Sequence, residues 1–174
     1  LEFRRVLFRS RVIEQTPVSV IITDRSGAIE YVNPQFEKIT GYTAAEVLGK
    51  RPNLLKSGMH KQELYEEMWR TIKNGGTWRG ELCSRAKDGS LFWESASILP
   101  ITDDDGSIRF YVSVKEDITE RRQAQQALAK SEQTLRTVSE ASQDAIIMID
   151  SSGAVTFWNP AAEMLFGHTA AEAV

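Results

Sequence analysis

A constant offset of 126 residues relates two stretches of this chain, and this repeat constrains the fold more than any other feature. The matched segments are Asp24 and Asp150, Ser26-Gly27-Ala28 and Ser152-Gly153-Ala154, Asn33-Pro34 and Asn159-Pro160, Gly41 and Gly167, and Thr43-Ala44-Ala45-Glu46 and Thr169-Ala170-Ala171-Glu172. A gapless repeat of this length predicts two copies of one structural unit. We therefore expect a complete domain over residues 12–120 and a truncated second domain over residues 140–174.

The first copy shows two short strand patterns, then three helix patterns and then three strand patterns, which predicts an α+β fold. β-Branched segments on both sides of Gly27 predict a hairpin, and Asn33 before Pro34 and Thr43 before Glu46 are typical helix starts. The expected strands cover 19–24, 28–33, 77–86, 91–99 and 108–114, and the expected helices cover 34–41, 43–49 and 60–73. Pro100 is expected to end the fourth strand. The count is five strands.

Three of the four tryptophans, Trp69, Trp78 and Trp93, fall where the long helix and the sheet are expected to meet. In the helix, apolar residues at helical spacing place Trp69 on one face. In the strand over 77–86, alternation places Trp78, Leu82 and Ser84 on one face and Cys83 on the other. Such a cluster is either hydrophobic core or the lining of a ligand pocket.

The segment after the last strand changes character and predicts a helical linker over residues 121–139. It contains neither Gly nor Pro, and a sparse stripe recurs at alternating spacings of four and three, as in a two-stranded coiled coil. The stripe is formed by Ala124, Leu128, Ser131, Leu135 and Val138. We expect a homodimer through this helix. The truncated second copy is expected to leave apolar residues such as Met148 and Phe157 partly unpaired.

Composition excludes several classes of function. The formal net charge is −3 and basic residues are interspersed with acidic ones, so no nucleic-acid partner is expected. The single cysteine suits a reducing, cytoplasmic location, and no apolar run is long enough to contact a membrane as a spanning segment. No nucleophile, base or metal-ligand cluster is present, which indicates a regulatory module rather than an enzyme. Residues 1–11 are interpreted as a non-native segment or a leader and are given no function.

Three single residues are interpreted conservatively. His60, at the start of the long helix, is expected to be a solvated helix-end histidine, and Glu81 and Glu94 are expected at exposed strand positions.

Six motifs in order resemble the PAS domain of bacterial sensor proteins. They are the first hairpin, Asn33-Pro34, Gly41-Tyr42, Gly49-Lys50, Lys87-Asp88-Gly89 and Asp117-Ile118-Thr119. The resemblance covers residues 12–120 and returns over 138–174. It implies a PAS fold: a five-stranded antiparallel sheet with short helices on one face and a small pocket between them.

Further motifs are similar to the FAD-binding PAS domains of nitrogen-fixation redox regulators. They are Asn53-Leu54-Leu55-Lys56-Ser57-Gly58, Tyr65, Trp69, Trp78-Arg79-Gly80 and Arg85-Ala86-Lys87-Asp88-Gly89. The resemblance implies a flavin site lined by Trp69, Ser84, Asn53, Leu55, Tyr65, Trp78 and Leu82. Two positions depart from the subgroup, because Pro52 stands where it has a glutamate and Ser84 where it has an asparagine.

The function implied by this resemblance is a sensory input module. It would sense redox state or a small ligand, with FAD as the expected cofactor, and relay the signal through Asp117, Ile118 and Thr119 into the linker helix. The output domain of a longer parent chain, a histidine kinase or a cyclic-dinucleotide enzyme among others, would receive it. The alternative is a cofactor-free PAS module for dimerisation or protein interaction.

Overall fold

The computed structural model describes residues 13–174, so the leader segment predicted over residues 1–11 lies outside the described residues. The chain divides into two compact units, the first ending at Arg122 and the second beginning at Gln123.

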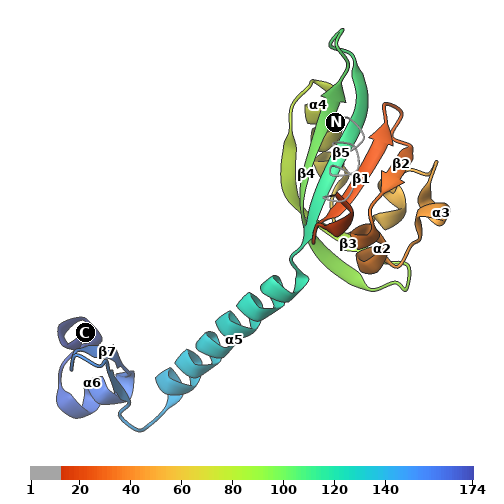
Figure 1. The fold of residues 1–174 in the computed structure, drawn as a ribbon. Coiled ribbons are helices and arrows are strands. Elements are labelled where there is room, and N and C mark those ends of the chain that lie inside the picture. The colour runs from red at the N-terminus through yellow and green to blue at the C-terminus, as the bar shows by residue number, and fades with distance from the viewer. Residues whose placement is uncertain (1–12) are drawn as a thin grey trace. The chain divides into compact units, whose positions relative to one another are not determined.

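A five-stranded sheet forms the centre of the first unit (Figure 1). Its strands are β1 (Ser19–Asp24), β2 (Ile29–Val32), β3 (Trp78–Arg85), β4 (Leu91–Thr102) and β5 (Ile108–Asp117). They lie in the order β2-β1-β5-β4-β3, and every neighbouring pair is antiparallel. The predicted five-stranded antiparallel sheet is therefore confirmed. Strand β5, the last of the sheet, lies at its centre.

Short helices cover one face of this sheet. They are α2 (Pro34–Thr40), α3 (Ala44–Val47), the 3-10 helix η1 (Pro52–Leu55) and α4 (Gln62–Lys73). The predicted start of α2 is confirmed, because the Asn33 side chain accepts a hydrogen bond from the Phe36 N–H and Pro34 occupies the first turn. Gly41, in the left-handed conformation at φ 72°, ends the helix.

Strand β4 is longer than predicted, because it continues through Pro100 to Thr102. Strand β3 begins opposite Ile98, so beyond this residue β5 is the one strand neighbour of β4 within residues 13–174. A proline, which lacks an N–H, is tolerated at such a partly open edge. The expectation that Pro100 ends the strand was wrong for this reason.

Trp78 is held close to the sheet by a glycine two residues further along β3. A Cβ atom added at Gly80 would lie 2.7 Å from Cζ2 and 2.8 Å from Cη2 of Trp78, closer than any real contact. The ring is 5% exposed and belongs to a core cluster with Ile72, Leu82 and Tyr111. Gly80 is therefore needed for close packing rather than for a turn.

We expect Gly80→Ala to destabilise the first unit by about 1–3 kcal/mol, because the added methyl group forces the Trp78 ring out of its packed position. Urea unfolding followed by tryptophan fluorescence measures the change. The double variant Gly80→Ala with Trp78→Phe is the control, since the smaller ring gives room for the methyl group and should recover part of the loss. A neutral Gly80→Ala variant would contradict the contact.

Helix α5 (Thr119–Ala141) follows β5 directly, and the second unit then repeats the opening of the first. Its elements are β6 (Ile147–Ile149), β7 (Val155–Trp158), α6 (Pro160–Phe166) and α7 (Ala170–Ala173). Buried Asn159 accepts hydrogen bonds from the N–H groups of Ile146 and Ala162, as Asn33 does from Val20 and Phe36. The repeat predicted from the sequence therefore recurs in the hydrogen bonds.

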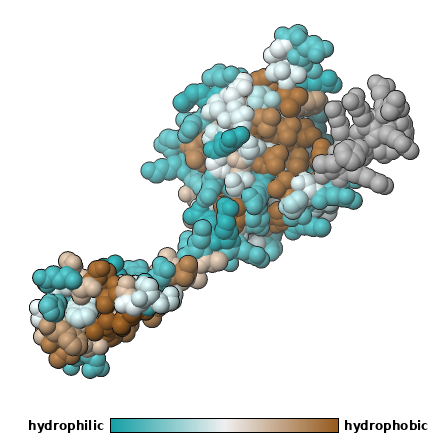
Figure 2. Space-filling model, turned by 60° about the vertical axis from the view of Figure 1, so that its left-hand side comes forward, coloured by the Kyte–Doolittle hydropathy of each residue, from teal (hydrophilic) through white to brown (hydrophobic). Residues whose placement is uncertain are grey.

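The second unit leaves much apolar surface uncovered. Met148 is 53% exposed and Phe166 is 51% exposed. Brown, apolar residues gather on the surface of this unit in Figure 2. Within residues 13–174, no helix combines the length and the apolar character needed to cross a membrane.

Candidate ligand pocket

A cavity of about 810 Å³ lies between helix α4 and the helix-covered face of the sheet. The β1–β2 turn and η1 contribute further walls. Ligand pockets in proteins have volumes of about 300–1,000 Å³, so this cavity has the size of a small-molecule site. Most of the lining surface is apolar, although exposed charged side chains such as Arg51, Lys56 and Lys73 also line the cavity and a few polar side chains lie on the sheet.

Six of the seven site residues predicted from the sequence line this one cavity. They are Trp69, Ser84, Asn53, Leu55, Tyr65 and Leu82. Trp69 and Tyr65 come from α4, Leu82 and Ser84 from β3, and the other two from η1. The structure thus brings together residues that are more than thirty positions apart in the sequence. Their role in binding stays a prediction.

Trp78, the seventh predicted residue, is not among the lining residues. Its ring is buried in the neighbouring core cluster against Leu82 and Ile98. The alternation in β3 correctly placed Trp78 on the same face as Ser84, but the ring lies over Gly80 rather than at the cavity. Trp78 is a core residue in this structure.

The aromatic walls of the cavity pack against each other. The ring of Trp69 meets Tyr111 of β5 edge-to-face, with centroids 5.8 Å apart. A Cβ atom at Gly27, which has φ 86° in the β1–β2 turn, would lie 3.2 Å from Cη2 of Trp69. Burial raises the pKa of the Tyr65 phenol, with smaller contributions from Cys83 and Glu94, and burial also raises that of Tyr111. Both phenols are therefore neutral near pH 7 and offer hydroxyl groups rather than charges.

A buried ion pair lies beneath the sheet side of the cavity. Nζ of Lys115 in β5 lies 2.6 Å from Oε1 of Glu94 in β4, and the two side chains are 8% and 4% exposed. Oγ of Ser84 donates a hydrogen bond to the same Glu94 oxygen at 2.6 Å. Lys115 and Ser84 line the cavity. The expectation that Glu94 is exposed was wrong, because its side chain lies on the helix-covered face of the sheet, against Ser84 and Lys115.

Ser113 adds an unpartnered hydroxyl to the same floor. It lies two residues before Lys115 on β5, it is 8% exposed, and it lines the cavity. Its Oγ is the one buried side-chain oxygen or nitrogen within residues 13–174 that has no hydrogen-bond partner. Buried polar groups in native proteins are almost always paired. A free hydroxyl that lines a cavity therefore points to a ligand or an ordered water there.

Lys115, Ser113 and Tyr111 were missed from the sequence, where alternation groups them on one face of the strand but does not show that this face turns inward. Alternation placed Phe110, Val112 and Val114 on one side of the last strand, so the other three residues had to share the opposite side. The apolar set is half-buried on the outer face of the sheet, while the polar set faces the cavity.

The segment between η1 and α4 closes the edge of β3 near the pocket. The Cys83 N–H donates to Nε2 of His60 at 2.6 Å, and Oγ of Ser57 donates to the Cys83 carbonyl at 2.6 Å. The expectation of a solvated His60 was wrong, because the imidazole satisfies an edge-strand N–H and lies beside the rings of Tyr65 and Trp93. Cys83 is buried on the sheet face opposite Ser84.

The start of α5 is tied to the strand that carries Glu94. The Trp93 N–H donates to Oγ1 of Thr119 at 2.8 Å, and the Ile118 N–H donates to the Trp93 carbonyl at 2.8 Å. Asp117 accepts from the Thr119 N–H, and Ile118 is 2% exposed. The guanidinium of Arg122 lies 3.9 Å from the centre of the Trp93 ring. Thr119 and Ile118 of the predicted relay thus bond to Trp93, the residue next to Glu94, while Asp117 bonds to Thr119.

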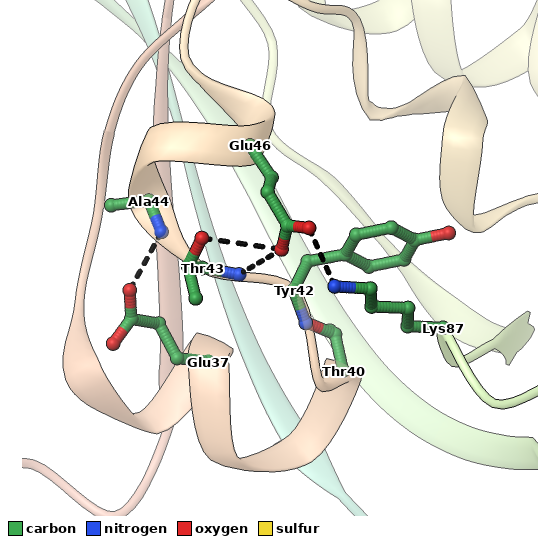
Figure 3. Close-up of polar contacts among 7 residues, drawn as sticks. All are labelled: Glu37, Thr40, Tyr42, Thr43, Ala44, Glu46 and Lys87. Atoms are coloured by element: carbon green, nitrogen blue, oxygen red, sulfur yellow. Dashed lines mark hydrogen bonds and ion pairs between the residues drawn. The ribbon is translucent and has the colours of Figure 1, made fainter.

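A separate polar network joins the short helices to the β3–β4 turn (Figure 3). Glu46 closes the predicted capping box at Thr43, and Nζ of Lys87 lies 2.5 Å from the other Glu46 oxygen. Glu37 accepts from the Ala44 N–H at 2.6 Å. The Lys87 hydrogen bond, together with the Thr43 N–H, lowers the pKa of Glu46 to about 2.

We expect the contribution of Glu46 to stability to be fully present above pH 4.5 and to disappear as the pH falls toward about 2. The sign follows because the folded state binds the proton of Glu46 less readily than the unfolded state does. The difference in melting temperature between the wild type and Glu46→Gln, measured across this range, should therefore shrink on acidification. Glu172, which has the same capping box but no lysine bonded to it in residues 13–174, provides the matched control. A pH-independent difference would contradict the assignment.

Within residues 13–174, no group of three or more His, Cys, Asp or Glu side chains is arranged to hold a metal ion. The first unit is thus an α+β domain with an antiparallel sheet and a ligand-sized cavity beneath helix α4, and its last strand is followed by a long helix.

The chain belongs to the PAS family. The family described as PAS domain matches residues 17–120, and the family described as PAS fold matches residues 133–174. PAS domains of this kind are sensory modules of signalling proteins, and the relatives include a hybrid signal transduction histidine kinase of Dictyostelium discoideum and the aerotaxis receptor of Escherichia coli.

Two curated relatives illustrate the similarity. A nitrogen fixation regulatory protein of Klebsiella pneumoniae is 31% identical over 148 residues, which cover 85% of this chain and 30% of the relative. The bacterioopsin transcriptional activator of Halobacterium salinarum is 33% identical over 130 residues, which cover 73% of this chain and 19% of the relative. The chain thus spans less than a third of the length of either relative.

Solved structures show the same fold. An RNA-binding light-oxygen-voltage receptor superposes with a TM-score of 0.65 at 26% identity, over 74% of this chain and 37% of the receptor. The LOV domain of the Erythrobacter litoralis EL346 blue-light activated histidine kinase gives a TM-score of 0.56 at 27% identity, over 60% of this chain and 99% of that domain.

Proposed function

We propose that the first unit is a flavin-binding sensory input module, with FAD as its cofactor, that reports redox state through helix α5. The observation that carries the proposal is the cavity of about 810 Å³ with the unpartnered Ser113 hydroxyl on its floor. Similarity to a nitrogen fixation regulatory protein and to LOV domains supports a flavin as the ligand class.

The chemistry of the cavity matches that of a flavin ring. A planar aromatic ring gains from contact with aromatic walls, which Trp69, Tyr65 and Tyr111 provide. The polar edge of such a ring needs hydrogen-bond partners, and Ser113 and Lys115 offer donors on the floor. Pro52, which stands where the subgroup has a glutamate, also lines the cavity, so the polar partners come from the sheet instead.

Exposed cationic side chains favour a nucleotide-bearing flavin. They are Arg25, Arg51, Lys56, Arg70 and Lys73, and all of them line the same cavity. Glu66 is the one acidic side chain among the described lining residues. A diphosphate carries negative charge that such a rim attracts. FAD therefore suits the site better than a flavin without phosphate.

The relay that we propose runs through Glu94 and Trp93. When bound, a flavin supplies a ring nitrogen that changes from hydrogen-bond acceptor to donor on reduction. Ser84 and Lys115, which line the cavity, both hold Glu94, and the neighbouring Trp93 holds Thr119 and Ile118 at the start of α5. A change in the hydrogen bonds of the floor would therefore shift the backbone that sets the position of α5.

Helix α5 is proposed to form a homodimer and to pass the signal to an output domain of the parent chain. Leu128, Leu135 and Val138, which belong to the predicted coiled-coil stripe, are 61–65% exposed. An apolar stripe of this kind gains from a second helix. The same observation favours the second candidate function, a cofactor-free dimerisation module. We further propose that the described residues are regulatory rather than catalytic, and that they act in the cytoplasm without nucleic acid.

Flavin content tests the proposal. The chain is purified after expression with ample riboflavin, and its absorption spectrum is recorded. We expect one flavin per chain, released on denaturation and identified as FAD by chromatography, and reversible bleaching with dithionite. A folded chain that carries no flavin, and takes up none on incubation with FAD, would leave the dimerisation module as the function.

A further inference from the structure

The floor of the cavity carries a cation that is only partly used inside the protein. The Lys115 ammonium has three N–H donors, and its hydrogen bond within residues 13–174 goes to Oε1 of Glu94. Ser84 shares the same acceptor oxygen. Lys115 therefore keeps two donors, and it lines the cavity while Glu94 is not among the lining residues.

The Ser113 hydroxyl adds a further free donor to the floor of the cavity. Ser113 lies on the same face of β5 as Lys115, two residues away, and its Oγ is unpartnered. Two spare ammonium donors and one free hydroxyl thus face a cavity that lies largely between aromatic and apolar walls. Electrostatic interactions are much stronger in such surroundings than in water.

We propose that Lys115 is a specificity-determining residue that makes the pocket prefer a planar ligand with a negatively charged edge over its neutral form. Glu94 positions the ammonium and partly neutralises it, which limits the preference. This inference rests on the proposed flavin function, and it deepens that function because it states which redox form the pocket holds more tightly.

A preference for the negatively charged form raises the reduction potential of the bound flavin. Two electrons from dithionite and one proton from solvent convert the neutral oxidised ring into a monoanion. We expect this form to bind at least about tenfold more tightly than the oxidised form, which raises the two-electron potential of the bound flavin by about 30 mV. The exposed cationic side chains stabilise oxidised and reduced FAD by nearly equal amounts, because solvent and salt screen their charges.

The test compares the dissociation constants of oxidised and dithionite-reduced FAD for the apo chain, measured anaerobically by tryptophan fluorescence. The ratio of the two constants is determined for the wild type, for Glu94→Gln, and for the double variant Glu94→Gln with Lys115→Met. Glu94→Gln keeps an acceptor for Ser84 and Lys115 but removes the countercharge, so the ratio should rise. The double variant removes both charges, so the ratio should fall to about one, and the midpoint potential should follow it.

Lys56→Met is the matched control, because Lys56 lines the same cavity but is exposed. It should weaken both forms of FAD by similar factors and leave the ratio unchanged. Equal ratios in the wild type and the double variant, with FAD bound in both, would overturn the role of Lys115 and leave the flavin function standing. A folded wild type that binds neither form would overturn both.

Discussion

Glu94→Leu should destabilise the first unit by about 3–5 kcal/mol, because it leaves the Lys115 ammonium buried without its countercharge. The two side chains are 4% and 8% exposed, so water in the cavity replaces the lost partner only in part. Lys115→Met should destabilise the first unit by a similar amount, because it leaves the Glu94 carboxylate buried without its countercharge. Urea unfolding of each variant measures the change in the free energy of unfolding.

The double variant, Glu94→Leu with Lys115→Met, separates this cause from a general loss of packing. Replacement of both members of a buried ion pair by apolar residues is often neutral or stabilising by about 1–4 kcal/mol. We therefore expect the double variant to be at least as stable as the wild type. Additive losses in the double variant would show that the two residues act independently, which contradicts the pairing.

Trp69→Ala should weaken the binding of FAD by about 30-fold or more, because it removes an aromatic wall of the cavity. Loss of apolar and ring contacts worth about 2 kcal/mol corresponds to this factor. Trp69 is half-buried, so its loss should affect folding less than binding.

Trp78→Ala provides the matched control, because it removes the same side chain from the adjacent core rather than from the cavity. It should cost about 3–5 kcal/mol of stability and change the affinity of the folded chain for FAD much less. Fluorescence titration and urea unfolding of both variants give the two quantities. If Trp69→Ala lowered stability and FAD binding to the same degree, Trp69 would be a core residue as well.

The fold was predictable because its signals are local. Asn33-Pro34, Gly41 and the Thr43 capping box mark helix ends in the sequence, and the structure places the helix boundaries within about two residues of them. The repeat at an offset of 126 residues added an independent check, because Asn159 repeats the bonding of Asn33. Sequence patterns of this kind do not depend on strand pairing.

The polar floor of the pocket was not predictable, because it depends on register. Glu94 and Lys115 meet because β4 pairs with β5, and Ser84 reaches Glu94 across the pairing of β3 with β4. Alternation gives the two faces of each strand but not which face turns inward. Here the more polar face of β5 turns toward the cavity, which reverses the usual expectation for a half-buried strand.

His60 illustrates the same difficulty on a smaller scale. A histidine at the start of a helix is usually solvated, and nothing near it in sequence indicates otherwise. Its acceptor role depends on Cys83, which lies 23 residues further along the chain. Long-range partners of this kind require the folded chain.

Amide hydrogen exchange tests most directly whether a change of redox state in the pocket alters the start of helix α5. The exchange is measured on the FAD-loaded chain in its oxidised state and in its dithionite-reduced state. The amides to follow are those of Trp93 and Ile118, whose hydrogen bonds hold the start of α5. The Val20 amide, held by buried Asn33, is the internal reference. We predict that the protection of Trp93 and Ile118 differs between the two states while that of Val20 stays the same. Identical protection at all three amides, with FAD bound and reduced, would contradict the relay.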